Sequence, residues 1–270
     1  AFNAGNYDES VNAQISSETI TKVLYPNDEQ EAGQILRLEQ QYFFVSCSLR
    51  DMIRLQLQRE QNLDHFHEKF VVQLNDTHPS IAVAELMRLL VDDYDVAWEK
   101  AWSIVRQTFA YTNHTLLPEA LEVWPVAFFE RILPRHLQII YLINRAFLDE
   151  VTARWPGDSE RRSRMSLIDE GGGRQVRMAN PAVVASHTVN GVAKLHSELM
   201  TKRRMQEVGR GMVSHDGRAA ERINLRLNGF PCFRVSTKNF PLMQKIFIKL
   251  LRVSNFDCDC RGFEHSLISE

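Results

Sequence analysis

The sequence predicts an α/β fold that contains at least some parallel sheet. Short apolar runs typical of buried strands occur at residues 70–74 and 109–111. Each run is followed by a polar turn and then by a proline of the kind that favours the start of a helix. Long helical patterns surround these two units. Strand, turn and helix repeated in this order are typical of parallel strands joined by helical crossovers.

Length and composition fit a globular protein. The chain has 270 residues, of which 44% are hydrophobic, so it can bury the core of one large domain or two small ones. A net charge of −2 gives no reason to expect nucleic acid or an anionic membrane as a partner. No apolar run reaches the eighteen residues of a membrane span, and the first residues lack the pattern of a secretory signal. The chain does not begin with methionine, so we expect it to start within a longer protein.

The four cysteines predict neither a disulfide framework nor a metal site. One lies in a helical pattern and three in the last forty residues, which is too sparse and uneven for a framework. Cys258 and Cys260 are too isolated to predict a zinc site. We therefore expect no metal and a reducing, cytoplasmic setting.

The first half of the chain contains one long helix and one strand–turn–helix unit. Residues 1–30 are polar, with turn residues at 25–28. From residue 31 to about 58, apolar residues recur every three or four positions, which predicts an amphipathic helix; they are Ile35, Leu38, Tyr42, Val45, Leu49 and Met52. Residues 75–78 form the turn after the first strand, and Pro79 is predicted to start the next helix.

The second unit follows directly. Asp95 is a candidate cap for a helix over residues 96–107, after which comes the strand at 109–111. Pro118 opens a pattern with Leu121 and Trp124 three apart, which predicts another helix. Residues 134–155 predict a long helix closed by a Pro-Gly pair, and residues 171–173 are a glycine turn.

The last seventy residues differ in character. Residues 201–270 hold 13 Lys and Arg against 7 Asp and Glu, and glycines and prolines interrupt their patterns. This change predicts either a separate basic segment or sequence that does not belong to the same fold. We expect residues 1–200 to form the domain and residues 201–270 to be poorly ordered.

Polar residues gather where the two predicted strands end. They are Asn75, Asp76, His78, Asn113 and His114. In open α/β sheets, ligands bind beyond the carboxyl ends of the strands. Neutral donors and acceptors with a single carboxylate suit a polyhydroxyl ligand better than a metal ion, which needs three regularly spaced ligands.

Other interpretations of these residues stay open at this point. Asn, Asp, Thr and His before a helix are also ordinary capping residues. Asn75 and Asn113 both fit the glycosylation pattern, which is a poor interpretation without a secretory signal. Trp98 and Trp102 are better explained as core than as a sugar platform. Glu119 and Glu122, three apart, are better explained as a solvated helix face than as a carboxylate pair.

Several long strings of the sequence resemble the glycogen/starch (α-1,4-glucan) phosphorylase family. They are "VLYPNDEQEAGQILRLEQQYFF", "LNDTHPSIAVAELMRLLVD", "AYTNHTLLPEALEVWP", "ILPRHLQIIYLIN", "MSLIDEG" and "SHTVNGVAKLHSEL", in the family's order. The resemblance runs from Phe2 to about Met200 and is very specific.

The resemblance implies transfer of a terminal glucosyl unit from an α-1,4-glucan to inorganic phosphate, with retention, giving glucose 1-phosphate. It implies pyridoxal 5'-phosphate as cofactor and usually a homodimer. The implied fold is a pair of Rossmann-like domains of the glycosyltransferase-B type with the active site between them. This chain matches only the later, helix-rich part of the first domain, and is therefore incomplete.

The resemblance also implies roles for individual residues. His114 matches the residue that binds the 6-hydroxyl of the reacting glucose, and Asp76 and His78 belong to the same polar pocket. Asn113 adjoins His114, and Glu122 matches a carboxylate on the pocket wall. Tyr25, Pro26, Asn27 and Asp28 match a loop that gates substrate access, with Asp28 at its acidic tip.

Several family features are absent or altered. Glu29 stands where some relatives have an asparagine that touches glucose, and Arg54 is followed by Leu55 instead of a second arginine for an activating nucleotide. The cofactor lysine and the phosphate-binding residues are missing after Met200, and "STKNF" at 236–240 is not the lysine motif. We therefore expect a phosphorylase fragment that is inactive alone. The alternative is a non-catalytic glucan-binding or interaction protein that reuses this half-domain.

Overall fold

A computed structural model describes residues 5–23, 26–115, 117 and 121–193 of the chain. The predicted tail at 201–270, Tyr25, Pro118 and Glu119 lie outside these residues. The described residues fall into two compact units, one up to Arg37 and one from Leu38 onward. Helix α2 (Glu31–Arg59) begins in the first unit and continues into the second.

The first unit contains helix α1 (Tyr7–Lys22) and a loop held against the start of α2. Arg37 Nη1 lies 2.7 Å from Asp28 Oδ2, and Gln34 Nε2 donates to the carbonyl of Asp28. The loop approaches α2 at Gly33, where a Cβ atom would lie 1.7 Å from the Asn27 carbonyl oxygen. Glycine is therefore required at this position for the loop to take this path.

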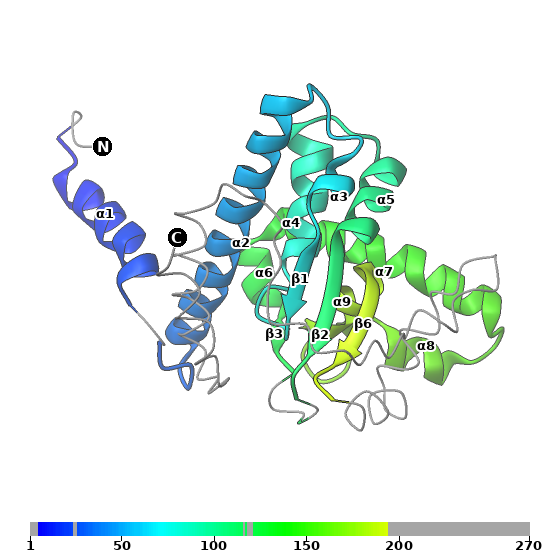
Figure 1. Ribbon diagram of the computed structural model, residues 1–270. Coiled ribbons are helices and arrows are strands. Elements are labelled where there is room, and N and C mark those ends of the chain that lie inside the picture. The colour runs from blue at the N-terminus through cyan, green and yellow to red at the C-terminus, as the bar shows by residue number, and fades with distance from the viewer. Residues whose placement is uncertain (1–4, 24–25, 116, 118–120, 194–270) are drawn as a thin grey trace. The chain divides into compact units, whose positions relative to one another are not determined.

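The second unit is built on a parallel sheet of strands β1 (Val72–Asn75), β2 (Phe109–Asn113) and β6 (Ser186–Gly191). The strands lie in the order β1-β2-β6, and both pairs are parallel (Figure 1). Parallel neighbours need crossover connections, which here are helical. The sheet therefore confirms the predicted fold class, a mixed α/β protein with parallel strands.

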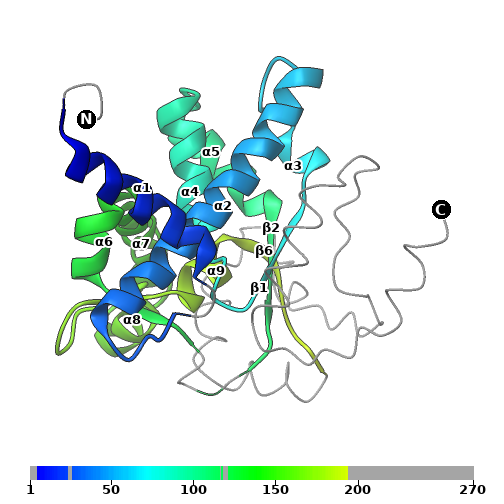
Figure 2. The same cartoon turned by 90° about the vertical axis from the view of Figure 1, so that its left-hand side faces the viewer.

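Helices cover one side of this sheet. The chain from β1 to β2 passes through α4 (Ala82–Arg88), the π-helical turn η2 (Leu89–Asp93) and α5 (Trp98–Thr108). Later helices are α6 (Val126–Ile132), α7 (Pro134–Arg154), α8 (Ser159–Met165) and α9 (Ala179–Ala185), and α3 (Phe66–Lys69) precedes β1. Figure 2 shows α4, α6, α7 and α9 on the same side of the three strands. No helix within the described ranges is long and apolar enough to cross a membrane.

A second, antiparallel sheet joins three short strands in the order β3-β5-β4. They are β3 (Val123–Pro125), β4 (Ile168–Asp169) and β5 (Gln175–Arg177). Trp124 pairs with Val176, and the Trp124 side chain is 5% exposed. Pro125 is tolerated because β3 is an edge strand. The predicted helix from Pro118 through Trp124 is therefore wrong at its described end, because pairing with β5 decides the structure there.

Two helix starts also differ from the prediction. Pro79 lies in a turn, where the amide of Ala82 donates to the Pro79 carbonyl, and α4 begins only at Ala82. Asp95 caps no helix. It has a positive φ of 53°, and α5 begins after Ala97, which makes no side-chain cap hydrogen bond. Aspartate adopts this left-handed conformation more readily than most residues, so Asp95 serves the turn after η2 instead.

A buried charged cluster joins α2, α4 and α7 in the second unit. Glu85 is fully buried and accepts hydrogen bonds from Ser46 Oγ (2.7 Å) and Arg88 Nε (2.8 Å). Its Oε2 atom also lies 2.6 Å from Nε2 of the buried His136. Burial raises the pKa of a carboxyl group, but the bonds from these three partners outweigh it and lower the pKa of Glu85 to about 2. The cluster therefore holds three helices together through one carboxylate.

Glu85 should make the stability of the chain depend on pH. Its folded pKa of about 2 lies below the ordinary value of 4.5, so its contribution is complete above pH 4.5 and is lost as the pH falls toward 2. This lowering corresponds to about 3 kcal/mol. We expect Glu85→Gln to reduce the free energy of unfolding by about that amount at pH 7 and by much less near pH 2.5. Urea unfolding of both proteins at each pH measures this difference, and a difference independent of pH would contradict the assignment.

Candidate functional site

The two predicted polar turns lie side by side because β1 and β2 end at the same edge of the sheet. Leu74 pairs with Tyr111, and Asn75 pairs with Thr112. The next residues of each strand leave the sheet together. The sequence-based expectation that these two turns meet is confirmed by the strand register.

Asp76 links the two turns. Its backbone amide donates to the carbonyl of Thr112 (2.9 Å), and its Oδ1 atom accepts from the backbone amide of His114 (2.8 Å). The residue is 5% exposed and has a positive φ of 56°. A non-glycine residue in this conformation persists only where its surroundings hold it. Asp76 therefore fixes the position of His114 through the backbone.

His114 lies half-buried directly after β2. Its Nε2 atom lies 3.3 Å from Oδ1 of Asn75. Because the amide oxygen is an acceptor, this contact fits the tautomer that carries its proton on Nε2, and Nδ1 is then an acceptor atom. The neutral amide of Asn75 thus contacts one edge of the imidazole.

Asn113 has a different environment from its neighbour. Its side chain is fully buried, and Nδ2 donates to the hydroxyl oxygen of Tyr111 (3.2 Å). Burial raises the pKa of Tyr111, so its hydroxyl stays protonated. The contacts of Asn113 stabilise the end of β2, and a contact with sugar stays a prediction for this residue.

Glu122 is held by residues from two distant parts of the chain. Its Oε1 atom accepts from Gln41 Nε2 (3.0 Å) on α2, and its Oε2 atom accepts from the hydroxyl of Thr77 (3.1 Å). His78 Nε2 lies 4.0 Å from Oε1. Glu122 precedes β3 and belongs to no helix, so the interpretation of Glu122 as part of a solvated helix face is wrong. Its carboxylate instead lies beside the turn that contains Asp76.

Asn27 and Asp28 make their contacts within the first unit. Asn27 Oδ1 accepts from the amide of Glu29 (3.0 Å), and Asp28 pairs with Arg37. Their participation in the sugar site with Asp76 and His114 stays a prediction.

Sequence reasoning missed Gln41 and Thr77. Gln41 lies on the inward stripe of α2, between the buried Leu38 and Val45. A polar residue on such a stripe needs a partner in the interior. The position of Gln41 on this stripe therefore indicated that it bonds to a polar group elsewhere in the chain.

The described residues do not fit a pyridoxal phosphate site. An imine with that cofactor needs a lysine amine beside groups that bind phosphate. The described lysines instead pair with carboxylates at the surface; they are Lys22 with Glu18, Lys69 with Glu60 and Lys100 with Asp64. Among the same described residues, no group of His, Cys, Asp and Glu side chains could hold a metal ion.

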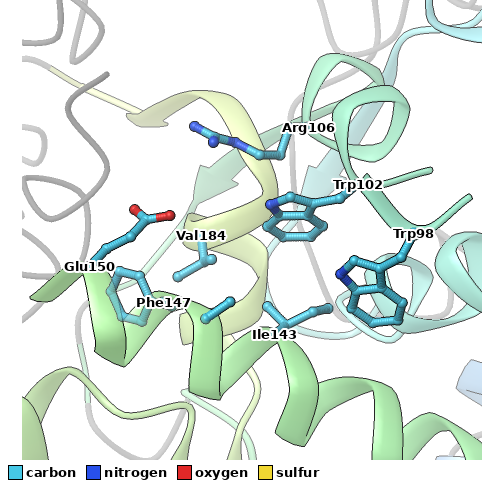
Figure 3. A pocket seen from close by; sticks show the side chains of 8 residues that line it. Trp98, Trp102, Arg106, Ile143, Phe147, Glu150 and Val184 are labelled. Atoms are coloured by element: carbon cyan, nitrogen blue, oxygen red, sulfur yellow. The ribbon is translucent and has the colours of Figure 1, made fainter. Parts of the chain in front are cut away.

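Trp98 and Trp102 line a separate shallow hollow that is open to solvent (Figure 3). Figure 3 shows both indole rings of α5 near Ile143 of α7, with Phe147 farther along the same helix, near Val184 and Glu150. The two tryptophans are half-buried, so they pack on apolar side chains but lie at the edge of the core. None of the predicted site residues lines this hollow.

Comparisons with known proteins agree with the strings and the geometry. A family model described as "Carbohydrate phosphorylase" matches residues 1–222. A glycogen phosphorylase of Synechocystis sp. is 60% identical over 199 residues, which are 74% of this chain and 23% of that protein. Glycogen phosphorylase 2 of Dictyostelium discoideum is 50% identical over 200 residues, 74% of this chain and 20% of that protein.

A third relative is the muscle form of glycogen phosphorylase from Ovis aries. It is 50% identical over 209 residues, which are 74% of this chain and 25% of that protein. The chain thus spans about a quarter of the length of the curated relatives it matches. Since the family model covers most of the sequence, this chain belongs to the carbohydrate phosphorylase family.

Proposed function

We propose that this chain is the sugar-binding part of an α-1,4-glucan phosphorylase, which transfers a glucosyl unit from glucan to inorganic phosphate. Family membership supports the reaction class, because the relatives are glycogen phosphorylases. The observation that carries the proposal for this chain is the bond from the His114 amide to Asp76, which fixes two polar turns at one sheet edge. In this proposal the fold is the incomplete first Rossmann-like domain of a glycosyltransferase-B enzyme.

His114 and Asp76 are the proposed catalytic residues. The His114 imidazole orients the 6-hydroxyl of the reacting glucose, and Asp76 holds His114 in place. A neutral imidazole suits this task, because it adds no repulsion to the positive charge that develops on the sugar carbon. His78 and Glu122 form the side wall, Asn113 supports the end of β2, and Asn27 and Asp28 belong to the access loop.

The whole enzyme is proposed to use pyridoxal 5'-phosphate held by residues outside this chain. The cofactor supplies a phosphate group for proton transfer, and no described residue is assigned to it. A dimeric parent is proposed as well, and exposed apolar side chains of α1 support it; they are Tyr7, Val11 and Ile15. Cys47, the one cysteine among the described residues, is a free thiol, in keeping with a cytoplasmic setting.

The chain alone should have no phosphorylase activity. The acceptor phosphate and the cofactor phosphate need residues that the described part does not supply, and half a cleft leaves the reacting carbon in water, where electrostatic stabilisation is weak. We expect no glucose 1-phosphate from glycogen and phosphate, and no imine absorbance after incubation with pyridoxal phosphate and dialysis. The full-length Synechocystis relative serves as the positive control in both assays.

Two results would change this proposal. Turnover by the chain alone, with one lysine trapped stoichiometrically by borohydride, would show that the chain is a complete enzyme. Glucan binding by the chain, with no turnover when this segment is placed in the full-length relative, would instead favour the non-catalytic glucan-binding protein.

A further inference from the structure

Gln41 is a polar residue on the inward stripe of α2. Its neighbours on the inward stripe, Leu38 and Val45, are 0% and 5% exposed. An amide at such a position destabilises the fold unless it has a hydrogen-bond partner. Its partner is a residue 81 positions later in the sequence, the Glu122 carboxylate at the predicted sugar site.

Both oxygens of the Glu122 carboxylate are held. Gln41 Nε2 donates to Oε1 (3.0 Å), and the hydroxyl of the fully buried Thr77 donates to Oε2 (3.1 Å). The bonds reach different oxygens of the carboxylate, one from α2 and one from the turn after β1. Two fixed donors determine the plane and the direction of the group.

The orientation of the Gln41 amide shows which bond dominates. With Nε2 toward Glu122, the Gln41 Oε1 atom is buried and has no hydrogen-bond partner in the described part of the chain. The reversed amide would place an oxygen against the carboxylate, where two acceptors repel. The bond from Nε2 to Glu122 therefore outweighs the free-energy cost of leaving Oε1 without a partner.

The held carboxylate faces the more open side of the cluster. The Glu122 side chain is 11% exposed, whereas that of His78, 4.0 Å from Oε1, is 38% exposed. The neutral amide of Gln41 orients Glu122 without forming an ion pair with it. A lysine or arginine at position 41 would form such an ion pair. A carboxylate offers about four acceptor positions, so Glu122 can accept a further hydrogen bond from a ligand hydroxyl near His78.

We propose that Gln41 is a positioning residue of the sugar site, which orients Glu122 to accept a hydrogen bond from a glucosyl hydroxyl beside His78. This inference rests on the proposed function. A hydroxyl held in this way is bound in both the ground state and the transition state, so loss of the orientation should weaken binding more than it slows the chemical step.

The test uses a full-length phosphorylase that carries residues 38–193 of this chain. We expect Gln41→Leu to raise KM for glucan roughly 5- to 10-fold with kcat changed less than about 2-fold. Compared with the unmutated segment at the same pH, which accounts for titration of the nearby His78, Gln41→Glu should raise KM at pH 8 and raise it less at pH 6, because two adjacent carboxylates share a proton more readily at low pH. Gln58→Leu, an exposed glutamine of the same helix, is the matched control and should change neither constant.

The outcomes separate the two proposals. If Gln41 has only a structural role, Gln41→Leu should have a normal KM, or Gln41→Leu and Gln41→Glu should lose activity equally at every pH. Either result overturns the positioning role. A parent that carries the unmutated segment and releases no glucose 1-phosphate would overturn the proposed function instead. For that case, the carboxyl carbon resonance of Glu122 in the 270-residue chain should still change in Gln41→Leu and not in Gln58→Leu. Thermal unfolding of each variant confirms that it is folded.

Discussion

Replacing His114 by alanine should lower kcat/KM of a full-length phosphorylase that carries this segment by roughly 10²- to 10³-fold. The loss corresponds to about 2.7–4 kcal/mol of transition-state stabilisation, the usual cost of removing one well-placed hydrogen-bonding group. The imidazole is the only part removed, since the backbone bond to Asp76 remains. Steady-state kinetics in the direction of glucan breakdown measure the effect.

Folding should change little in this variant. His114 is half-buried after the end of β2 and lies outside the apolar core. His65→Ala provides a matched control, because His65 is an exposed histidine that pairs with Glu68. It should leave kcat/KM unchanged. Normal kinetics in a well-folded His114→Ala protein would count against His114 as a sugar-recognition residue.

The parallel strands and their shared edge follow from local sequence. The strands at 72–75 and 109–113 are short and begin with apolar residues, and a helical segment of sufficient length separates them. Such a pair forms a parallel crossover, which brings their carboxyl ends together. Asp76 and His114 could therefore be predicted as neighbours from the sequence, although the bond between them depends on the positive φ of Asp76.

The β3 strand could not be predicted in the same way. Leu121 and Trp124 fit a helical spacing, yet Trp124 pairs with Val176, more than fifty residues later. Short apolar segments fit either structure, and the partner strand decides between them. The mistaken helix also led to the wrong environment for Glu122, because a residue on a helix face and a residue before an edge strand point to different neighbours.

Local sequence patterns also do not identify the partners of inward-facing polar groups. Gln41 is half-buried on the inward stripe of α2, and Glu85 is fully buried on α4. Each meets its partner across a long stretch of sequence, Glu122 and His136 respectively. The pattern indicates that such a residue needs a partner, whereas only packing of the helices identifies it.

His136→Ala should be among the most destabilising single changes in the chain, costing roughly 3–5 kcal/mol of the free energy of unfolding. His136 is 4% exposed, and its Nε2 atom lies 2.6 Å from the fully buried Glu85 carboxylate. Its ring also packs edge-on against Tyr42 of α2, with ring centroids 5.1 Å apart. The alanine leaves a buried carboxylate with one partner fewer and a cavity between α2 and α7. Urea unfolding of the 270-residue chain at pH 7 measures the loss.

The neighbouring Arg135 gives the control for this prediction. It pairs with Asp92 at the surface, where the two side chains are 42% and 28% exposed, so Arg135→Ala should cost less than about 1 kcal/mol. Replacing both Glu85 and His136 by leucine should recover part of the stability lost in His136→Ala, because no carboxylate then remains buried and Arg88 keeps its pair with Asp93. If His136→Ala cost no more than Arg135→Ala, the Glu85 carboxylate would not depend on His136, and the buried ion pair would not be what holds α7 to α4.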